Sequence, residues 1–156
     1  MTSTFLRFEA HRIDEPVVEQ LLDRYLAELT GHIPGFDPAL AAPPEAADFE
    51  PPGGLFLVGF AKDVPLAIGG VRRFAEGTGE IRRMWVAPVA RGRGYARLLL
   101  AALEEAARAA GYREVLLDTH GSLDAALALY RSSGYRERER YNDNAFAEHF
   151  FAKRLE

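Results

Sequence analysis

Three strand-like segments follow one another near the middle of the chain, and the links between them are too short to hold a helix. The segments are residues 55–61, 66–74 and 79–87, and the links are residues 62–65 and 76–79. The links contain Gly, Pro and Asp, which favour tight turns. Neighbouring parallel strands need a crossover of about a dozen residues or more, so the segments predict an antiparallel meander.

The segments before and after this meander have the periodicity of helices. Apolar residues recur every three or four positions after Asp14 and Pro16, which are suited to start a helix, and again before Gly111. In chain order, the expected elements are a strand at 4–9, a helix ending near Gly31, the three central strands, a helix at 95–110, a strand at 115–117, a helix from Leu123 to Gly134, and strands at 135–141 and 148–155. This order predicts an α+β fold with one mixed, mostly antiparallel sheet flanked by helices, and the length predicts a single domain over residues 1–156.

The composition narrows the functional classes. The chain has no cysteine, four scattered histidines and a formal net charge of −4. Disulfides, cysteine-ligated metals and thiol nucleophiles are therefore excluded, and no histidine pair suggests a metal site. The negative charge argues against general binding to nucleic acid or to a membrane surface. Because no long apolar run or signal-peptide pattern is present, we expect a soluble cytoplasmic protein. From the cysteines and histidines, we expect no bound metal.

The charge is unevenly distributed along the chain. Residues 72–97 contain seven arginines and two acids, a local balance of +5, whereas residues 31–52 carry four acids and no Lys or Arg. The basic stretch predicts a site for a small polyanion, with surface arginines scattered by chance as the alternative. Six of the nine prolines lie in residues 31–54. We interpret this segment as a rim over a site or, alternatively, as a mobile excursion.

The motif that bears most directly on function is Arg91-Gly92-Arg93-Gly94-Tyr95-Ala96, between a predicted strand and a predicted helix. Its glycines allow positive φ, its arginines suit phosphate oxygens, and the helix N-terminus adds unpaired N–H groups, so the motif predicts a pyrophosphate site. A P-loop would need Gly-Lys-Ser/Thr, and a dinucleotide fingerprint would need glycine where Arg97 stands, so both fit poorly. A glycine-rich turn without a ligand is the remaining alternative.

The same motif carries a resemblance to a known family. Arg91-x-x-Gly94-x-Ala96 is similar to the Arg/Gln-x-x-Gly-x-Gly/Ala signature of the GNAT N-acetyltransferase superfamily. Beginning 35 residues downstream of Arg91, residues 126–135 resemble the family's A-x-x-L-Y-x-x-x-G-F/Y block. The resemblance covers residues 55–141 and implies the GNAT fold, an α/β sandwich, with acetyl-CoA as the cosubstrate.

The resemblance also implies which residues hold the cosubstrate. The loop residues Arg91, Gly92, Arg93, Gly94, Tyr95 and Ala96 would bind the pyrophosphate of acetyl-CoA, and backbone groups of Met84, Trp85 and Val86 would pair with its pantetheine arm. The arm would lie where this strand parts from residues 115–118. One position departs from the family, because Leu123 stands where many members have an asparagine that contacts the cofactor.

Two side chains are candidates for the chemistry. Tyr130 is expected to protonate the departing thiolate, because a phenol with a pKa near 10 stays protonated at neutral pH. Glu80 is the candidate general base, since histone-type members of the superfamily have a catalytic glutamate at the same spacing, eleven residues before the arginine. The alternatives are a core tyrosine, and a glutamate paired with Arg82 or with a cross-strand arginine.

These features predict an N-acetyltransferase that transfers acetyl from acetyl-CoA to a primary amine by direct attack in a ternary complex, since no cysteine can carry the acyl group. The acidic segment 31–52, with Phe36 and Phe49 as walls, suggests a cationic small-molecule amine as acceptor. A peptide or protein acceptor, a non-catalytic CoA-binding regulatory module and a nucleotide-binding domain are the alternatives. Family members are often dimers, so a homodimer is also among the expectations.

Overall fold

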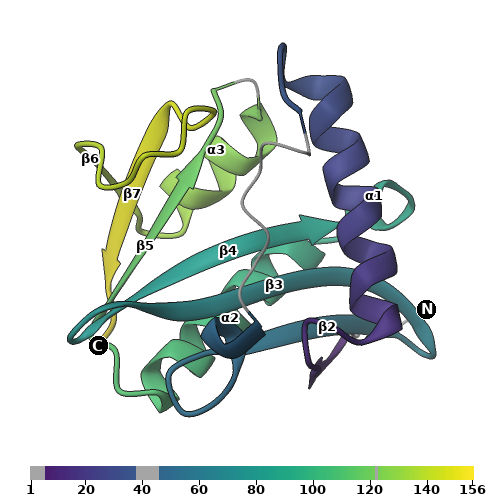
Figure 1. The fold of residues 1–156 in the computed structure, drawn as a ribbon, viewed down its shortest axis with the longest axis horizontal. Coiled ribbons are helices and arrows are strands. Elements are labelled where there is room, and N and C mark those ends of the chain that lie inside the picture. Colours follow the sequence, from purple (N-terminus) through teal and green to yellow (C-terminus); the bar gives the residue numbers. More distant parts are fainter. Residues whose placement is uncertain (1–5, 38–45, 122) are drawn as a thin grey trace.

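The computed structural model describes residues 6–37, 46–121 and 123–156, and its strands form one seven-stranded sheet (Figure 1). The strand order is β1-β2-β3-β4-β5-β7-β6, and β4 and β5 are the parallel pair in an otherwise antiparallel sheet. The predicted mixed, mostly antiparallel sheet is therefore confirmed. The strands are β1 (Arg7–Ala10), β2 (Leu55–Ala61), β3 (Val64–Ala75), β4 (Thr78–Val86), β5 (Glu114–Thr119), β6 (Arg136–Arg138) and β7 (His149–Arg154).

The central meander is tighter than the sequence suggested. Strands β2, β3 and β4 are joined by turns of two residues, 62–63 and 76–77, because β3 begins and ends closer to its neighbours than expected. Lys62 and Gly77 take φ values of 55° and 77° in these turns. Positive φ at the first turn residue, as at Lys62, matches the twist of the flanking strands, and Gly77 takes its positive φ at the second turn residue without a steric cost.

Helices cover both faces of the sheet. Helix α1 (Pro16–His32) crosses the front of the view in Figure 1, and α2 (Tyr95–Ala109) and α3 (Asp124–Ser132) lie behind the sheet. Two 3₁₀ turns, η2 (Ala46–Phe49) and η3 (Pro88–Ala90), were not predicted. Residues 4 and 5 of the first predicted strand and residues 38–45 of the proline-rich segment lie outside the described residues. No helix in the described ranges is long and apolar enough to span a bilayer.

Each face of the sheet has its own apolar core. Leu99 and Leu103 of α2 are fully buried against the rear face, together with Tyr130 of α3. Val18 of α1 and Phe49 of η2 pack on the front face. Burying a leucine or valine side chain contributes about 1.5–3 kcal/mol, so these contacts fix both layers relative to the sheet.

The parallel pair of strands separates soon after it begins. Pairing between β4 and β5 joins Thr78 to Glu114, runs through one further position and ends at Glu80 with Leu116. Both strands continue beyond these residues, and Figure 1 shows β5 running away from β4. One edge of β4 after Glu80 therefore carries backbone groups that β5 does not bind.

Candidate active site

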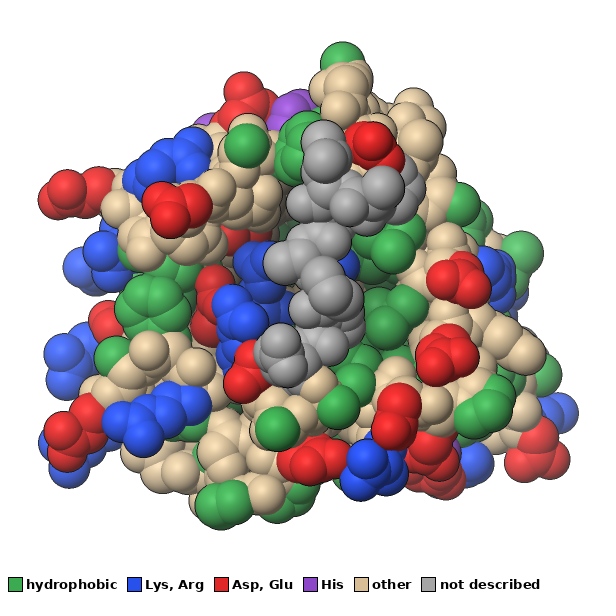
Figure 2. Space-filling view, viewed as in Figure 1, with side chains coloured by type: hydrophobic (Ala, Val, Ile, Leu, Met, Phe, Trp, Pro, Cys, Tyr) green, Lys and Arg blue, Asp and Glu red, His purple; other side chains and the backbone are tan. Residues whose placement is uncertain are grey.

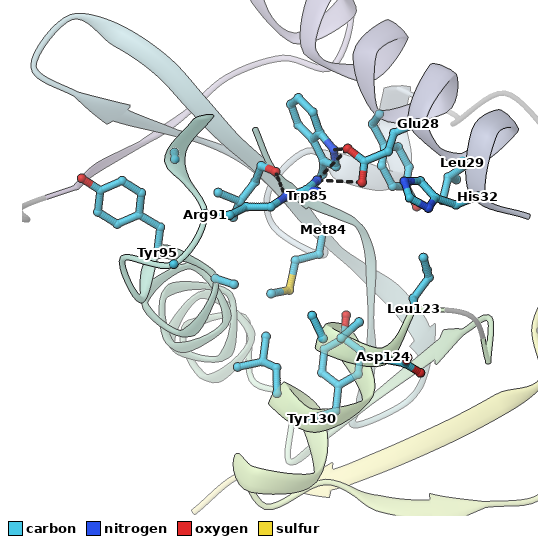
Figure 3. Close-up of a pocket in the computed structure, with 18 of the residues that line it drawn as sticks. Glu28, Leu29, His32, Met84, Trp85, Arg91, Tyr95, Leu123, Asp124 and Tyr130 are labelled. Carbon is cyan, nitrogen blue, oxygen red and sulfur yellow. Dashed lines mark hydrogen bonds and ion pairs between the residues drawn. The ribbon is translucent and has the colours of Figure 1, made fainter. Parts of the chain in front are cut away.

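A cavity of about 420 Å³ lies beside the end of β4, beyond the residues that pair with β5. Four parts of the fold line it: the second half of α1, the end of β4, the loop that enters α2, and α3 with the residue before it (Figure 3). Its lining residues are Tyr25, Glu28, Leu29, His32, Met84, Trp85, Val86, Ala90, Arg91, Gly92, Gly94, Tyr95, Ala96, Leu123, Asp124, Ala125, Ala126, Leu129 and Tyr130.

A β-bulge in β4 decides which side chains face the cavity. Between two paired positions, β3 contributes Gly69 alone and β4 contributes two residues, Arg83 and Met84. Arg83 has a φ of 59°, which lies in the left-handed region. The extra residue interrupts the alternation of the strand, because Ile81 and Met84 both pack toward α2 although they are three residues apart. Met84 is thereby turned into the cavity (Figure 3).

The glycine-rich loop forms the end of the cavity at the start of α2. Gly92 and Gly94 have φ values of 81° and 80°, and Gly94 is the residue that caps α2. The first N–H groups of a helix have no partner within it, so those of α2 are directed toward this loop. Tyr95 is buried and anchors the helix start, whereas Arg93 is exposed and does not line the cavity.

Arg91 is held by contacts that the sequence did not predict. Its Nε donates to the carbonyl oxygen of Val86 at 3.0 Å, and its Nη2 lies 2.6 Å and 2.7 Å from the carboxylate oxygens of Glu28 on α1. The indole N–H of Trp85 donates to the same carboxylate at 3.1 Å. Burial opposes ionisation of Glu28, but these two donors outweigh it and hold the pKa of Glu28 below its usual range.

Tyr130 lies on the opposite side of the cavity from α1. Its side chain is 7% exposed and packs against the rings of Tyr135 and Phe151. Figure 3 shows its hydroxyl pointing into the cavity, below Met84. Burial raises the pKa of Tyr130 well above its usual range, so the phenol is protonated at neutral pH. Leu123, the departure from the family pattern, also borders the cavity.

Glu80 is placed differently from the cavity residues. Its carboxylate is 1% exposed, receives hydrogen bonds from Arg72 at 2.9 Å and from the Tyr141 hydroxyl at 2.7 Å, and does not line the cavity. Arg72 is its cross-strand neighbour on β3. The cross-strand arginine pair that the sequence allowed as an alternative is therefore present. This geometry favours a structural role over direct contact with an acceptor amine.

Helix α1 is the part of the cavity wall that the sequence did not predict. Tyr25, Glu28 and His32 line the cavity, and their spacing of three and four residues places them on one face of the helix. The apolar periodicity of residues 17–29 predicts only an apolar stripe for this helix. The available signal was the pair of polar residues, Glu28 and His32, that interrupt the stripe near its end.

Asp48, Phe49 and Glu50, which are described residues of the acidic segment, do not line the cavity. Asp48 lies 3.7 Å from Arg72, and Glu50 lies 2.9 Å from Arg12, so both acids pair with arginines of the same chain. Phe49 is 3% exposed and belongs to the core under α1, so it is not a wall of the cavity. Glu45 lies outside the described residues. The expectation of a cationic acceptor thus gains no support from this segment.

The sequence and the fold were compared with those of known proteins. Residues 18–135 match the model of the Acetyltransferase (GNAT) family. An "IAA acetyltransferase" from Azospirillum brasilense is 35% identical over 122 residues, which cover 75% of this chain and 73% of that protein. Among solved structures, a GNAT acetyltransferase from Staphylococcus aureus superposes with a TM-score of 0.83 at 14% identity, covering 97% of this chain and 100% of that one. The PaiA N-acetyltransferase from Thermoplasma acidophilum, solved with coenzyme A, gives a TM-score of 0.68 at 13% identity, with 96% and 99% coverage.

Proposed function

Because the chain belongs to the GNAT family of acetyltransferases, we propose that it transfers an acetyl group from acetyl-CoA to a primary amine by direct attack in a ternary complex. The observation that carries the proposal is one continuous cavity. It joins a glycine-rich helix N-terminus, an open edge of β4 and a buried tyrosine.

The residues present fit a CoA ester at two places. The left-handed glycines Gly92 and Gly94 and the free N–H groups at the start of α2 suit a diphosphate. The edge of β4 at residues 84–86 offers backbone donors and acceptors for the amides of a pantetheine arm. The coenzyme A found with the Thermoplasma relative supports this choice of donor.

In the transfer, the acceptor nitrogen forms a bond to the thioester carbonyl carbon, the carbon–sulfur bond breaks, the nitrogen loses a proton and the sulfur gains one. Tyr130 is proposed to supply the proton to sulfur. Its burial keeps the phenol protonated, and its hydroxyl is directed into the cavity. A positioned acid of this kind contributes typically about 10²–10⁴-fold to the rate.

The proton from the acceptor nitrogen needs another destination. Glu80 was the candidate base, but both of its oxygens already accept hydrogen bonds and its side chain is buried. We therefore assign the proton to water in the cavity, with Glu80 holding Arg72 and Tyr141 in place. Small-molecule amines are the proposed acceptors, and peptides and a non-catalytic CoA-binding module are the alternatives to be tested.

The test is CoA release from acetyl-CoA with a panel of amines, with the acetylated product identified by mass spectrometry. Tyr130→Phe should lower kcat by about 10²–10⁴-fold. The Kd for acetyl-CoA should stay within about twofold of the wild-type value, because the hydroxyl is proposed to act only in the transfer. Tyr112→Phe is the control, since that hydroxyl bonds to Gly53 away from the cavity. An unchanged kcat would exclude Tyr130 as the acid, and acetyl-CoA binding without turnover of any amine would favour the non-catalytic module.

A further inference from the structure

One carboxylate joins three of the segments that line the cavity. Glu28 on α1 accepts a hydrogen bond at 3.1 Å from the indole N–H of Trp85, at the end of β4. Its two oxygens lie 2.6 Å and 2.7 Å from Nη2 of Arg91, at the start of the glycine-rich loop. The side chain of Glu28 is 22% exposed and borders the cavity. Glu28 therefore connects α1 both to β4 and to the glycine-rich loop.

The guanidinium of Arg91 is directed toward α1. Its Nε donates to the carbonyl oxygen of Val86 at 3.0 Å, and its Nη2 binds Glu28. Figure 3 shows the side chain reaching from its loop to the carboxylate on α1. Nε and Nη2 are a pair of donors that suits two parallel hydrogen bonds to a phosphate, and here both are used within the protein. The backbone N–H groups at the start of α2 remain to bind a diphosphate.

Apolar packing anchors the first half of α1 more firmly than the second. The two buried residues of the helix, Val18 and Leu21, lie in its first half. Residues 22–32 are all partly or largely exposed, yet four of them line the cavity. The placement of this second half therefore depends on polar contacts, and those of Glu28 reach the other cavity segments.

Glu28 differs from the other acids of α1. The helix carries three acids, and the other two, Glu19 and Asp23, are exposed. Figure 2 shows acidic side chains on the outer surface at the right of the view, where Figure 1 places α1. Burial opposes the charge of Glu28, and the hydrogen bonds from Arg91 and Trp85 offset this cost. The position of Glu28 is thus specified by its two partners.

The wall formed by α1 is the part of the cavity that the proposed donor leaves open. The pantetheine arm is proposed to lie along residues 84–86 of β4, and the diphosphate at the glycine-rich loop. Helix α1 faces Tyr130, the proposed acid, from the opposite side of the cavity. An amine that attacks the thioester beside Tyr130 therefore has α1 as its other neighbour, so the placement of this helix affects how the amine is oriented.

We propose that Glu28 and Arg91 are positioning residues, whose ion pair holds the second half of α1 in place as the wall for the acceptor amine. The inference rests on the proposed acetyltransferase function and assigns these two residues a part in it. Arg91 acts on the acceptor through Glu28 and α1, and its guanidinium is not a ligand of the diphosphate.

The test is a double-mutant cycle of Glu28→Gln, Arg91→Gln and the variant with both changes. Glutamine at position 28 keeps an oxygen for the Trp85 indole and removes the charge that Arg91 binds. Acetyl-CoA is the donor, and the acceptor is the amine of the panel with the highest kcat/KM. Each single variant should lower kcat/KM for this amine by about tenfold or more, because misplacement by about 1 Å can cost about 10²-fold.

The variant with both changes decides whether the two residues act as a pair. Its kcat/KM should lie within about threefold of that of the weaker single variant, because both substitutions remove the same contact. Losses that multiply would overturn the proposal, and so would single variants with the wild-type kcat/KM.

Binding of the donor separates positioning from direct contact with the diphosphate. Acetyl-CoA and S-acetyl-pantetheine, which lacks the diphosphate, are titrated calorimetrically into each single variant. The ratio of the two Kd values should stay within about threefold of the wild-type ratio. If Arg91 binds the diphosphate, Arg91→Gln weakens acetyl-CoA alone by about tenfold or more. A larger change of the ratio than about threefold, in either direction, overturns the proposal.

The fluorescence of Trp85 reports the position of α1 without any turnover. Trp85 is the only tryptophan of the chain and is 6% exposed. Acrylamide should quench its emission more strongly in Glu28→Gln and Arg91→Gln than in the wild type, with no further rise in the variant with both changes. Asp23→Asn is the matched control, because this exposed acid of the same helix does not line the cavity. It should leave both the quenching and kcat/KM unchanged.

The quenching also distinguishes this proposal from the proposed function. If no amine is acetylated, the acetyltransferase proposal fails, whereas the quenching still decides whether Glu28 and Arg91 hold α1 in place. Wild-type quenching in both single variants would overturn the positioning role even in an active enzyme.

Discussion

The sharpest prediction concerns the glycine that begins α2. Gly94 caps the helix with φ 80° and ψ 10°, and a Cβ built on it would meet no atom within 4 Å. Gly94→Ala therefore introduces no clash, and its cost to folding is the strain of placing a Cβ in the left-handed region. That strain is about 1–2 kcal/mol. In a protein of this size it should lower the Tm by about 2–8 °C.

Gly94→Ala should also weaken the binding of acetyl-CoA. The left-handed cap directs the first N–H groups of α2 toward the proposed diphosphate site. A hydrogen bond to a charged group contributes about 1.5–3 kcal/mol, so misdirecting one N–H should weaken binding about tenfold or more. The assay is calorimetric titration of acetyl-CoA, beside S-acetyl-pantetheine, which lacks the diphosphate. Affinity for the truncated ester should change by less than about twofold, because it makes no contact with the loop.

Gly77 provides a matched control. It has φ 77°, no atom within 4 Å of a built Cβ, and a position in the β3–β4 turn outside the cavity. Gly77→Ala should therefore cost the same stability as Gly94→Ala and leave the affinity for acetyl-CoA unchanged. The reasoning is refuted if Gly94→Ala binds acetyl-CoA normally, or if both esters weaken equally.

Two further predictions concern Glu80 and Glu28, which both form ion pairs with arginines. Glu80→Gln should lower the free energy of unfolding by about 3–5 kcal/mol, which is the usual cost of breaking a buried ion pair. The pH profile of kcat/KM should stay unchanged, because Glu80 is not expected to act as the base. If the variant loses the fall in kcat/KM at acidic pH, Glu80 is the base after all. The pKa of Glu28 is lower in the folded state than its unfolded value of about 4.5. Its ion pair with Arg91 therefore stabilises the fold at a pH above the unfolded pKa, and this stabilisation is lost as the pH falls through the folded pKa. The Tm difference between the wild type and Glu28→Gln should accordingly shrink between about pH 5 and pH 3, and a difference independent of pH would contradict the pairing.

The sequence predicted those parts of the fold that local patterns specify. Short links with turn residues identified the β2–β4 meander, and the apolar stripe with Gly111 at its end identified α2. The loop at residues 91–96 was predicted to border the site, and five of its six residues line the cavity. These features are local, because turn conformation and helical periodicity depend on residues close together in the chain.

The features that the sequence did not predict depend on distant partners. The segment Ile81-Arg82-Arg83-Met84 contains two adjacent arginines, and nothing local says which residue of the strand is the extra one. The bulge lies opposite Gly69 on β3, so its position depends on how two strands pair. Likewise, Glu28 and Arg91 are 63 positions apart, and only the packing of α1 on the sheet brings them together.

The opening beside β4 arises from two neighbouring features of this strand. Pairing with β5 ends at Glu80, and the bulge follows three residues later. At the point where the ladder stops, the Arg82–Asp118 ion pair at 2.9 Å joins the two separating strands through side chains instead of backbone. The arginine of this bridge is 22% exposed and the aspartate 6%, so the ion pair is largely shielded from water. The same bulge turns Met84 toward the cavity. The end of the pairing and the extra residue together place an open backbone edge and the Met84 side chain at the cavity.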